Sequence, residues 1–179
     1  TSRSVCKNVE VSARDILLAT ARRLVSEHGR LPSLDQLARE TGLSKGGVTH
    51  HLPTRGALVH ALIMTVVDET DRALDAAARD GQVVATWLAL SSETVVGGTS
   101  ITALARIALD DREQLGETAV AIATAITRWE ALLAAELGSP EKARIVRLVG
   151  DGLLLGRLID ERAPTLPLEE LMAVLGGHQ

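Results

Sequence analysis

The feature that most limits what this 179-residue chain can fold into is the helical spacing of its apolar residues, which continues over almost its whole length. Apolar positions recur at three- and four-residue steps, and glycine or proline separates one run from the next. The chain has no Phe, no Tyr and two Trp, so it lacks the aromatic residues in which strands are enriched. No segment is a convincing strand, and we expect an all-α fold.

The start and stop signals divide this pattern into about nine helices. Ser12, Ser33, Ser44 and Thr54 each precede an apolar run and are suited to cap it. The predicted helices span residues 11–29, 33–40, 44–51, 54–80, 82–96, 100–109, 111–137, 141–162 and 168–175. In the first helix the spacing predicts an inward face formed by Ile16, Leu17, Thr20, Leu24, Val25 and His28.

Charge is distributed unevenly along the chain. The formal net charge is −4, but residues 1–60 carry +4 and residues 61–179 carry −8. A basic N-terminal part beside an acidic remainder suggests a polyanionic partner for the N-terminal part alone. The scarcity of aromatic residues argues against a module that stacks single-stranded RNA on aromatic rings.

The single cysteine, Cys6, excludes an internal disulfide framework and a cysteine-based zinc cluster, and it indicates a reducing compartment. No apolar run is expected to reach the length of a membrane span, because Glu93 interrupts the stretch 81–105. No signal-peptide pattern is visible. We therefore expect a cytoplasmic protein with no membrane partner.

Residues 33–51 are the most informative stretch. Two short helices are joined by a tight turn at Thr41-Gly42-Leu43, where glycine can take a positive φ without steric cost. The spacing predicts an inward face formed by Leu34, Leu37, Leu43, Val48 and Leu52. This is the helix-turn-helix arrangement, in which the second helix enters a major groove of DNA.

The outward face of the second helix is polar and small, formed by Ser44, Lys45, Gly46, Gly47, Thr49 and His50. The two glycines cost about 1 kcal/mol each in a helix, but they permit close approach to a phosphate or base edge. Lys45 can bind a phosphate or a guanine edge, and Thr49 can bind a phosphate or contact a thymine methyl. The alternative is a weakly formed helix with incidental glycines and ordinary solvated side chains.

His50 and His51 point about 100° apart on a helix, so DNA-backbone contact or core packing is preferred over a shared metal. Thr54 and Arg55 stand at a helix N-terminus, where unpaired N–H groups favour an anion such as a DNA phosphate. The alternative there is plain helix capping by Thr54.

These residues carry a resemblance to a known family. The stretch Ile16 to Leu62 resembles the N-terminal domain of the tetracycline repressor (TetR) family, most specifically in Gly42 to Leu58, which reads GLSKGGVTHHLPTRGAL. The resemblance implies an all-α homodimeric repressor with a DNA-binding domain over 10–56 and a ligand-binding and dimerisation domain over 57–179. The implied partners are a palindromic double-stranded DNA operator and a small-molecule effector. The positions that match the family's DNA contacts are Ser33, Lys45, Thr49, His50, His51 and Arg55.

The sequence departs from the family pattern at four of these or neighbouring positions. Thr49 replaces a usual aromatic residue, often a phosphate-binding Tyr, which implies that this contact is lost or moved. Leu52 replaces a usual Phe, and Arg55 replaces a usual Lys and keeps its charge. Gly56 replaces a frequent Glu, which weakens the start of the following helix.

The C-terminal two thirds carry no nucleophile elbow and no metal-binding His pair, so we expect no enzymatic activity, cofactor or metal. Gly150, Gly152 and Gly156 approach a dinucleotide fingerprint, but no βαβ unit surrounds them. We interpret them as small residues that permit close helix packing.

Two apolar faces near the C-terminus are candidates for a dimer interface, as the resemblance implies. One consists of Leu148, Gly152, Leu155 and Ile159, and the other of Leu168, Leu171 and Leu175. Two such helices from each subunit would form a four-helix bundle. The alternative is that both faces belong to the core of the single chain.

The resemblance places the ligand pocket among the helices from 54 to 162. Candidate contacts are Met64, Trp87, Arg106 and Trp129, of which Arg106 could bind an acidic group in an otherwise apolar helix. Each also fits an ordinary core or surface position, and the default ligand is largely apolar. The leading hypothesis is a repressor released from its operator by that ligand. The alternatives are a helical ligand-binding or interaction protein with weakened DNA binding, and, less favoured, a small all-α enzyme.

Overall fold

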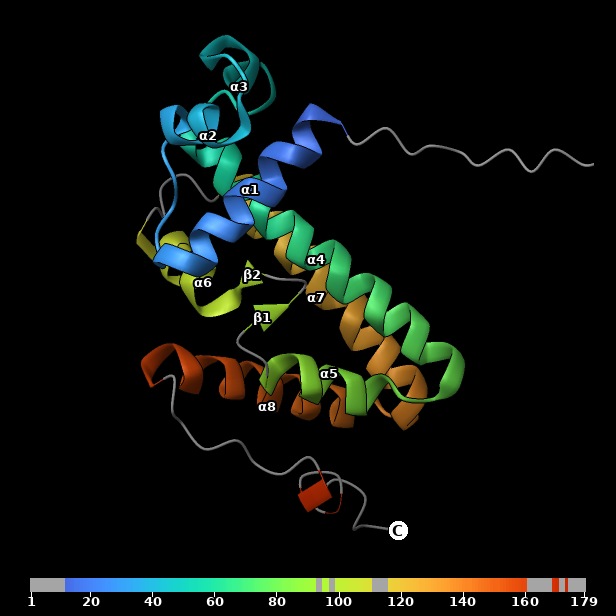
Figure 1. Ribbon diagram of the computed structural model, residues 1–179. Helices are drawn as coiled ribbons and strands as arrows, with labels where there is room; N and C mark the ends of the chain where they lie inside the picture. The colour runs from blue at the N-terminus through green and yellow to red at the C-terminus, as the bar shows by residue number, and fades with distance from the viewer. Residues whose placement is uncertain are drawn as a thin grey trace, which may run out of the picture.

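The computed structural model describes residues 12–92, 95–96, 99–110, 116–160, 169–170 and 173. Eight helices lie within these residues, together with one short hairpin, so the expectation of an all-α fold is confirmed (Figure 1). The elements are α1 (Ala13–His28), α2 (Leu34–Thr41), α3 (Lys45–His51), α4 (Arg55–Asp80), α5 (Val83–Ser92), β1 (Val95–Val96), β2 (Thr99–Ser100), α6 (Ile101–Asp110), α7 (Gly116–Leu137) and α8 (Pro140–Ile159).

Helices α1, α2 and α3 form one end of the molecule, which we call the head, and α4 to α8 form the body (Figure 1). Helix α4 runs from the head through the body, with α7 alongside it. Helices α5 and α8 pack on each other at the far end, and α6 lies beside α1. A single cluster of buried hydrophobic residues, mostly aliphatic, extends from the head through the body.

Helix α1 shows how local signals set the helix ends. The Ser12 hydroxyl accepts a hydrogen bond from the Asp15 backbone N–H, and the Asp15 carboxylate accepts from the Ser12 N–H, which forms a capping box. The hydrogen bonds from the Ser12 side chain and then its backbone lower the pKa of Asp15. Gly29 ends the helix at a φ of 65°, as expected from its position.

The inward face expected for α1 is only partly correct. Leu17, Leu24 and Val25 are buried as predicted, but Ile16 is 43% exposed and His28 is also exposed. Leu18 and Ala21 take the inward positions instead. Spacing alone does not fix the edge of an apolar stripe, because the elements that pack on α1, among them α2, β2 and α4, determine which side of it is covered.

The segment after α5 differs from the expected helix over 82–96. Helix α5 ends at Ser92, and β1 pairs with β2 in an antiparallel hairpin in which Val95 faces Ser100 and Val96 faces Thr99. The expectation that the chain contains no strand was therefore wrong at this point. Val95, Val96 and Thr99 are β-branched and flank Gly97-Gly98, and this composition favours extended backbone over helix.

The final expected helix, 168–175, is described only at Glu169, Glu170 and Ala173, which are helical. The remaining residues of that helix lie outside the described residues. Residues 111–115, which were expected to begin α7, lie outside them as well.

Helix α7 differs from the expectation that no apolar segment is long enough to span a membrane. Among the described helices it is long and apolar enough to cross a membrane by length and composition alone, although no apolar run of that length was expected. It packs against α4, α5 and α8, and its Arg128 forms an ion pair with Asp71 of α4. We therefore assign α7 to the helical body.

Helices α5 and α8 approach each other closely at Gly150. A Cβ at this position would contact Trp87 and would lie 2.6 Å from the Ser91 Oγ. The Trp87 Nε1–H donates to the carbonyl oxygen of Val146 at 3.3 Å, which fixes the indole across this contact. Close packing is thus confirmed for Gly150, whereas a Cβ at Gly152 or Gly156 would meet no described atom within 4 Å.

We expect Gly150→Ala to lower the free energy of unfolding by about 1–3 kcal/mol, because the added methyl overpacks the α5–α8 contact. Gly156→Ala is the matched control, and it is expected to raise stability by up to about 1 kcal/mol through helix propensity. Urea denaturation of both variants measures the two signs. Equal stabilisation by both substitutions would contradict the packing role of Gly150.

Candidate nucleic-acid interface

Helices α2 and α3 form the predicted helix-turn-helix. Gly42 between them has a φ of 72°, so the turn uses the conformation that glycine favours. Leu37, Val48 and Leu52 are buried, and Leu34 and Leu43 are half-buried against the same core, which confirms the predicted inward face. The opposite side of α3 is therefore turned to solvent.

Three hydroxyl residues predicted to contact DNA cap the helices around this face. Each accepts a hydrogen bond from a backbone N–H three residues later: Ser33 from Gln36 at 3.1 Å, Ser44 from Gly47 at 3.1 Å and Thr54 from Ala57 at 3.0 Å. All three side chains belong to exposed residues. A hydroxyl that accepts such a bond can still donate its own proton, so capping and phosphate contact are compatible.

The outward face of α3 is as small and polar as expected. Lys45, Gly46 and His50 are exposed, and Gly47, Thr49 and His51 are half-buried. A Cβ at Gly46 would lie 4.0 Å from the Ser44 Oγ, and one at Gly47 would lie 3.4 Å from it. These are ordinary contact distances, so packing among the described residues does not require glycine at either position.

Lys45 has a partner that the sequence analysis missed. Its ammonium nitrogen lies 3.0 Å from a carboxylate oxygen of Asp35, in the first turn of α2. Both side chains are well exposed, so the pair contributes at most about 1 kcal/mol. The sequence contains a hint of this pair, because a helix capped by Ser33 places Asp35 in its first turn.

The side chain of Thr49 is turned toward its own helix. Its hydroxyl donates to the carbonyl oxygens of Lys45 at 3.1 Å and Gly46 at 3.2 Å. The rings of His50 and His51 lie edge to face, with centroids 5.0 Å apart. Within the described chain, no group of three His, Cys, Asp or Glu side chains is placed to hold a metal ion.

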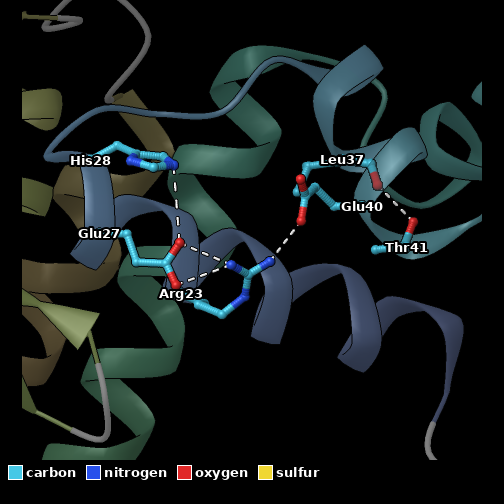
Figure 2. Close-up of polar contacts among 6 residues, drawn as sticks. All are labelled: Arg23, Glu27, His28, Leu37, Glu40 and Thr41. Carbon is cyan, nitrogen blue, oxygen red and sulfur yellow. Dashed lines mark hydrogen bonds and ion pairs between the residues drawn. The ribbon is translucent and has the colours of Figure 1, made fainter.

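Arg23 of α1 connects the first helix to α2 (Figure 2). Its guanidinium binds Glu27 at 2.9 Å on the same helix and Glu40 at 2.8 Å on α2. The hydrogen bonds with Glu27 and then Glu40 raise the pKa of Arg23 above its ordinary value. These exposed contacts orient α2 on α1 and add little free energy.

Other polar contacts join elements that are far apart in the sequence. Arg22 of α1 binds Glu69 of α4 at 2.7 Å, and both side chains are about four-fifths buried. The His60 Nδ1 of α4 lies 2.9 Å from the Thr118 Oγ1 of α7. The Ser100 N–H donates to the Ser26 Oγ of α1 at 3.1 Å.

The structure divides the candidate ligand contacts between two places. Trp87 and Trp129 are buried with ring centroids 5.6 Å apart, and the Trp129 Nε1–H donates to Asp71 at 2.6 Å. Met64 is half-buried on α4 against the core. Arg106 lies elsewhere, exposed on α6, and lines a cavity together with Arg157 of α8.

The predicted dimer face on α8 lies outside the core of the single chain. Leu148 is 54% exposed, Leu155 is 56% exposed and Ile159 is 79% exposed, and Gly152 is exposed between them. Ile145, 54% exposed, extends this row by one step and was missed. Leu168, Leu171 and Leu175 lie outside the described residues.

Comparison with known proteins bears on the fold. No protein-family model matches the sequence, and no curated protein matches it either. Among solved structures, the chain is similar to a crystal structure of a transcriptional regulator from Rhodococcus sp. Rha1, with 22% sequence identity and a TM-score of 0.67. The match covers 93% of this chain and 95% of that chain, so the likeness extends over head and body alike and shows a shared helical fold.

Proposed function

We propose that this protein is a DNA-binding transcriptional regulator of the TetR type, most simply a repressor that a small-molecule ligand releases from its operator. The observation that carries the proposal is the geometry of α3. Val48 and Leu52 anchor one side of the helix in the core, while Lys45, Gly46 and His50 point to solvent. A helix held in this way can enter a major groove.

Two further observations support this proposal. The glycines at 46 and 47 weaken α3 without filling a packing need among the described residues, and a closely approaching DNA backbone would supply a reason for them. The solved structure with the same fold is described as a transcriptional regulator, which favours the same class for this chain. We accordingly propose a DNA-binding domain over residues 10–56 and a ligand-binding and dimerisation domain over 57–179.

Helix α4 offers a route by which the body could control the head. Its N-terminal end, at Thr54 and Arg55, adjoins α3, and its remaining length is packed against α5, α6 and α7. In a dimer, two α3 helices would need a separation of about 34–36 Å to meet successive major grooves. A ligand that favours another position of α4 would change that separation and lower the affinity for DNA.

We expect Lys45→Ala and Arg55→Ala each to weaken operator binding by roughly tenfold, because each removes a cation from the proposed phosphate-contacting surface. Each substitution is also expected to reduce the salt slope of binding by about 1. Mobility-shift titrations at several salt concentrations, on DNA selected from a random pool, measure both quantities. Binding that is unchanged in both variants would reject this site assignment.

We expect Asp35→Asn to tighten DNA binding by about two- to fivefold. In this variant Lys45 does not have to break its ion pair with Asp35 before it binds a DNA phosphate. Asp80→Asn at the distant end of α4 removes the same charge and is the matched control. In a Lys45→Ala background the gain from Asp35→Asn should shrink. A gain of the same size in both backgrounds would mean that Asp35 acts by general repulsion of DNA and not through Lys45.

The second candidate function is a helical ligand-binding or interaction protein that has lost DNA recognition. The orientation of Thr49 favours it, since the hydroxyl that would replace an aromatic phosphate contact is bonded to its own helix. Failure to select any sequence from a random DNA pool, by a protein that retains ligand binding, would support this candidate over the first.

We also propose that the chain is a homodimer joined through the row Ile145, Leu148, Leu155 and Ile159 on α8. Large exposed apolar patches on soluble proteins commonly mark such interfaces. We expect Leu148→Glu with Leu155→Glu to shift the protein from dimer to monomer, measured by sedimentation velocity. Val120→Glu, at an exposed position on α7, is the control and should remain dimeric. A wild-type monomer at micromolar concentration would overturn this proposal.

A further inference from the structure

A cavity of about 350 Å³ lies where the head meets the body. Ser26 lines it from the C-terminal end of α1, Ser100 from β2, Thr102 and Arg106 from α6, and Arg157 from α8. This volume is at the lower end of the range of small-molecule sites. The cavity is distinct from the region of the two tryptophans, where the indoles pack against each other in the core.

The lining of this cavity has a consistent chemistry. Two guanidinium groups and three hydroxyl groups border it, and none of its described lining residues is acidic. The Arg106 Nη2 donates to the Leu158 carbonyl oxygen at 3.0 Å, which holds this side chain toward the end of α8. A guanidinium carries five N–H donors in a planar fork, so this bond is compatible with an oxyanion at the same group.

We infer that the cavity between α1, α6 and α8 binds a small molecule through an anionic group, either a carboxylate or a phosphate. Arg106 and Arg157 supply the positive charge, and the hydroxyls of Ser26, Ser100 and Thr102 supply the polar wall. This assigns a ligand class opposite to the largely apolar effector expected by default. Only the consequence for DNA rests on the proposed function, because the binding itself requires no DNA.

The position of the cavity gives it a route to the head. The Ser100 N–H binds the Ser26 Oγ of α1, and the Ser100 Oγ accepts from the Ala103 N–H at 3.2 Å at the start of α6. A ligand here would contact both sides of this junction at once. If the ligand binds more tightly to one position of α1 on the body than to another, its binding shifts the population toward the first position.

The test uses the full chain without DNA and isothermal titration calorimetry with three probes. Benzoate supplies a carboxylate, inorganic phosphate supplies the alternative anion, and benzamide is the neutral isostere of benzoate. We expect at least one anion to bind with a Kd below about 1 mM, and benzamide to bind at least tenfold more weakly than benzoate if the carboxylate is the preferred anion. Tighter binding of phosphate than of benzoate would identify the anionic group of the ligand as a phosphate.

Variants locate the binding. Arg106→Gln and Arg157→Gln should each weaken anion binding by about tenfold, and Arg106→Lys, which retains the charge and guards against a folding defect, should weaken it less. Arg144→Gln, on α8 but outside the cavity lining, should leave it unchanged. Thermal melts establish that each variant is folded.

Three results would overturn the inference. The first is no binding of either anion at about 10 mM, and the second is anion binding that both arginine variants retain in full. The third is an equal loss of anion binding in Arg144→Gln, which would show that general positive charge and not the cavity binds the anion. Operator selection that succeeds while the anion arms fail leaves the proposed function intact and rejects this site. Anion binding without operator selection supports this site and rejects the proposed function.

Discussion

The continuity of α4 is the constraint on which the rest of the structure depends. One helix of 26 residues, about 40 Å long, begins beside α3 and ends at the far side of the body. Its buried face includes Leu58 and Leu62 in the first third of the helix and Leu74 near its end, and all three are fully buried. Because both the head and the body pack against the same rigid rod, neither can move along it without breaking apolar contacts.

Polar contacts between separate elements add to the apolar core that the head and the body share. Arg22 with Glu69, His60 with Thr118 and Ser100 with Ser26 all join elements that are far apart in the sequence. One oxygen of Glu69, Oε2, is buried without a hydrogen-bond partner among the described residues. Hydrogen bonds demand specific geometry, so a small displacement of α1 would exchange the partners of Arg22 and Ser26 more readily than it would repack an aliphatic core.

The shortage of aromatic residues has a visible structural consequence. The body has one aromatic pair, Trp87 and Trp129, and the indole of Trp87 requires a glycine at position 150 on the opposing helix. In the head, an aliphatic side chain, Leu52, fills a buried position at the end of α3. On the outward face, the short side chain of Thr49 hydrogen-bonds to the backbone of its own helix. The lack of aromatic residues therefore leaves the core filled mostly by aliphatic side chains, but it changes which groups the outward face presents.

Much of this fold was predictable because it depends on local physical chemistry. Apolar spacing, capping residues and the glycine at 42 predicted α1 to α4 within one or two residues, and the inward face of the helix-turn-helix was correct. What required the tertiary structure was everything decided between elements. That includes which edge of α1 is covered, the hairpin at Val95 to Ser100, the pairing of Lys45 with Asp35, and the meeting of Arg106 with Arg157 at one cavity. Helix ends depend on neighbours within four residues, whereas these contacts depend on how separate helices pack against one another.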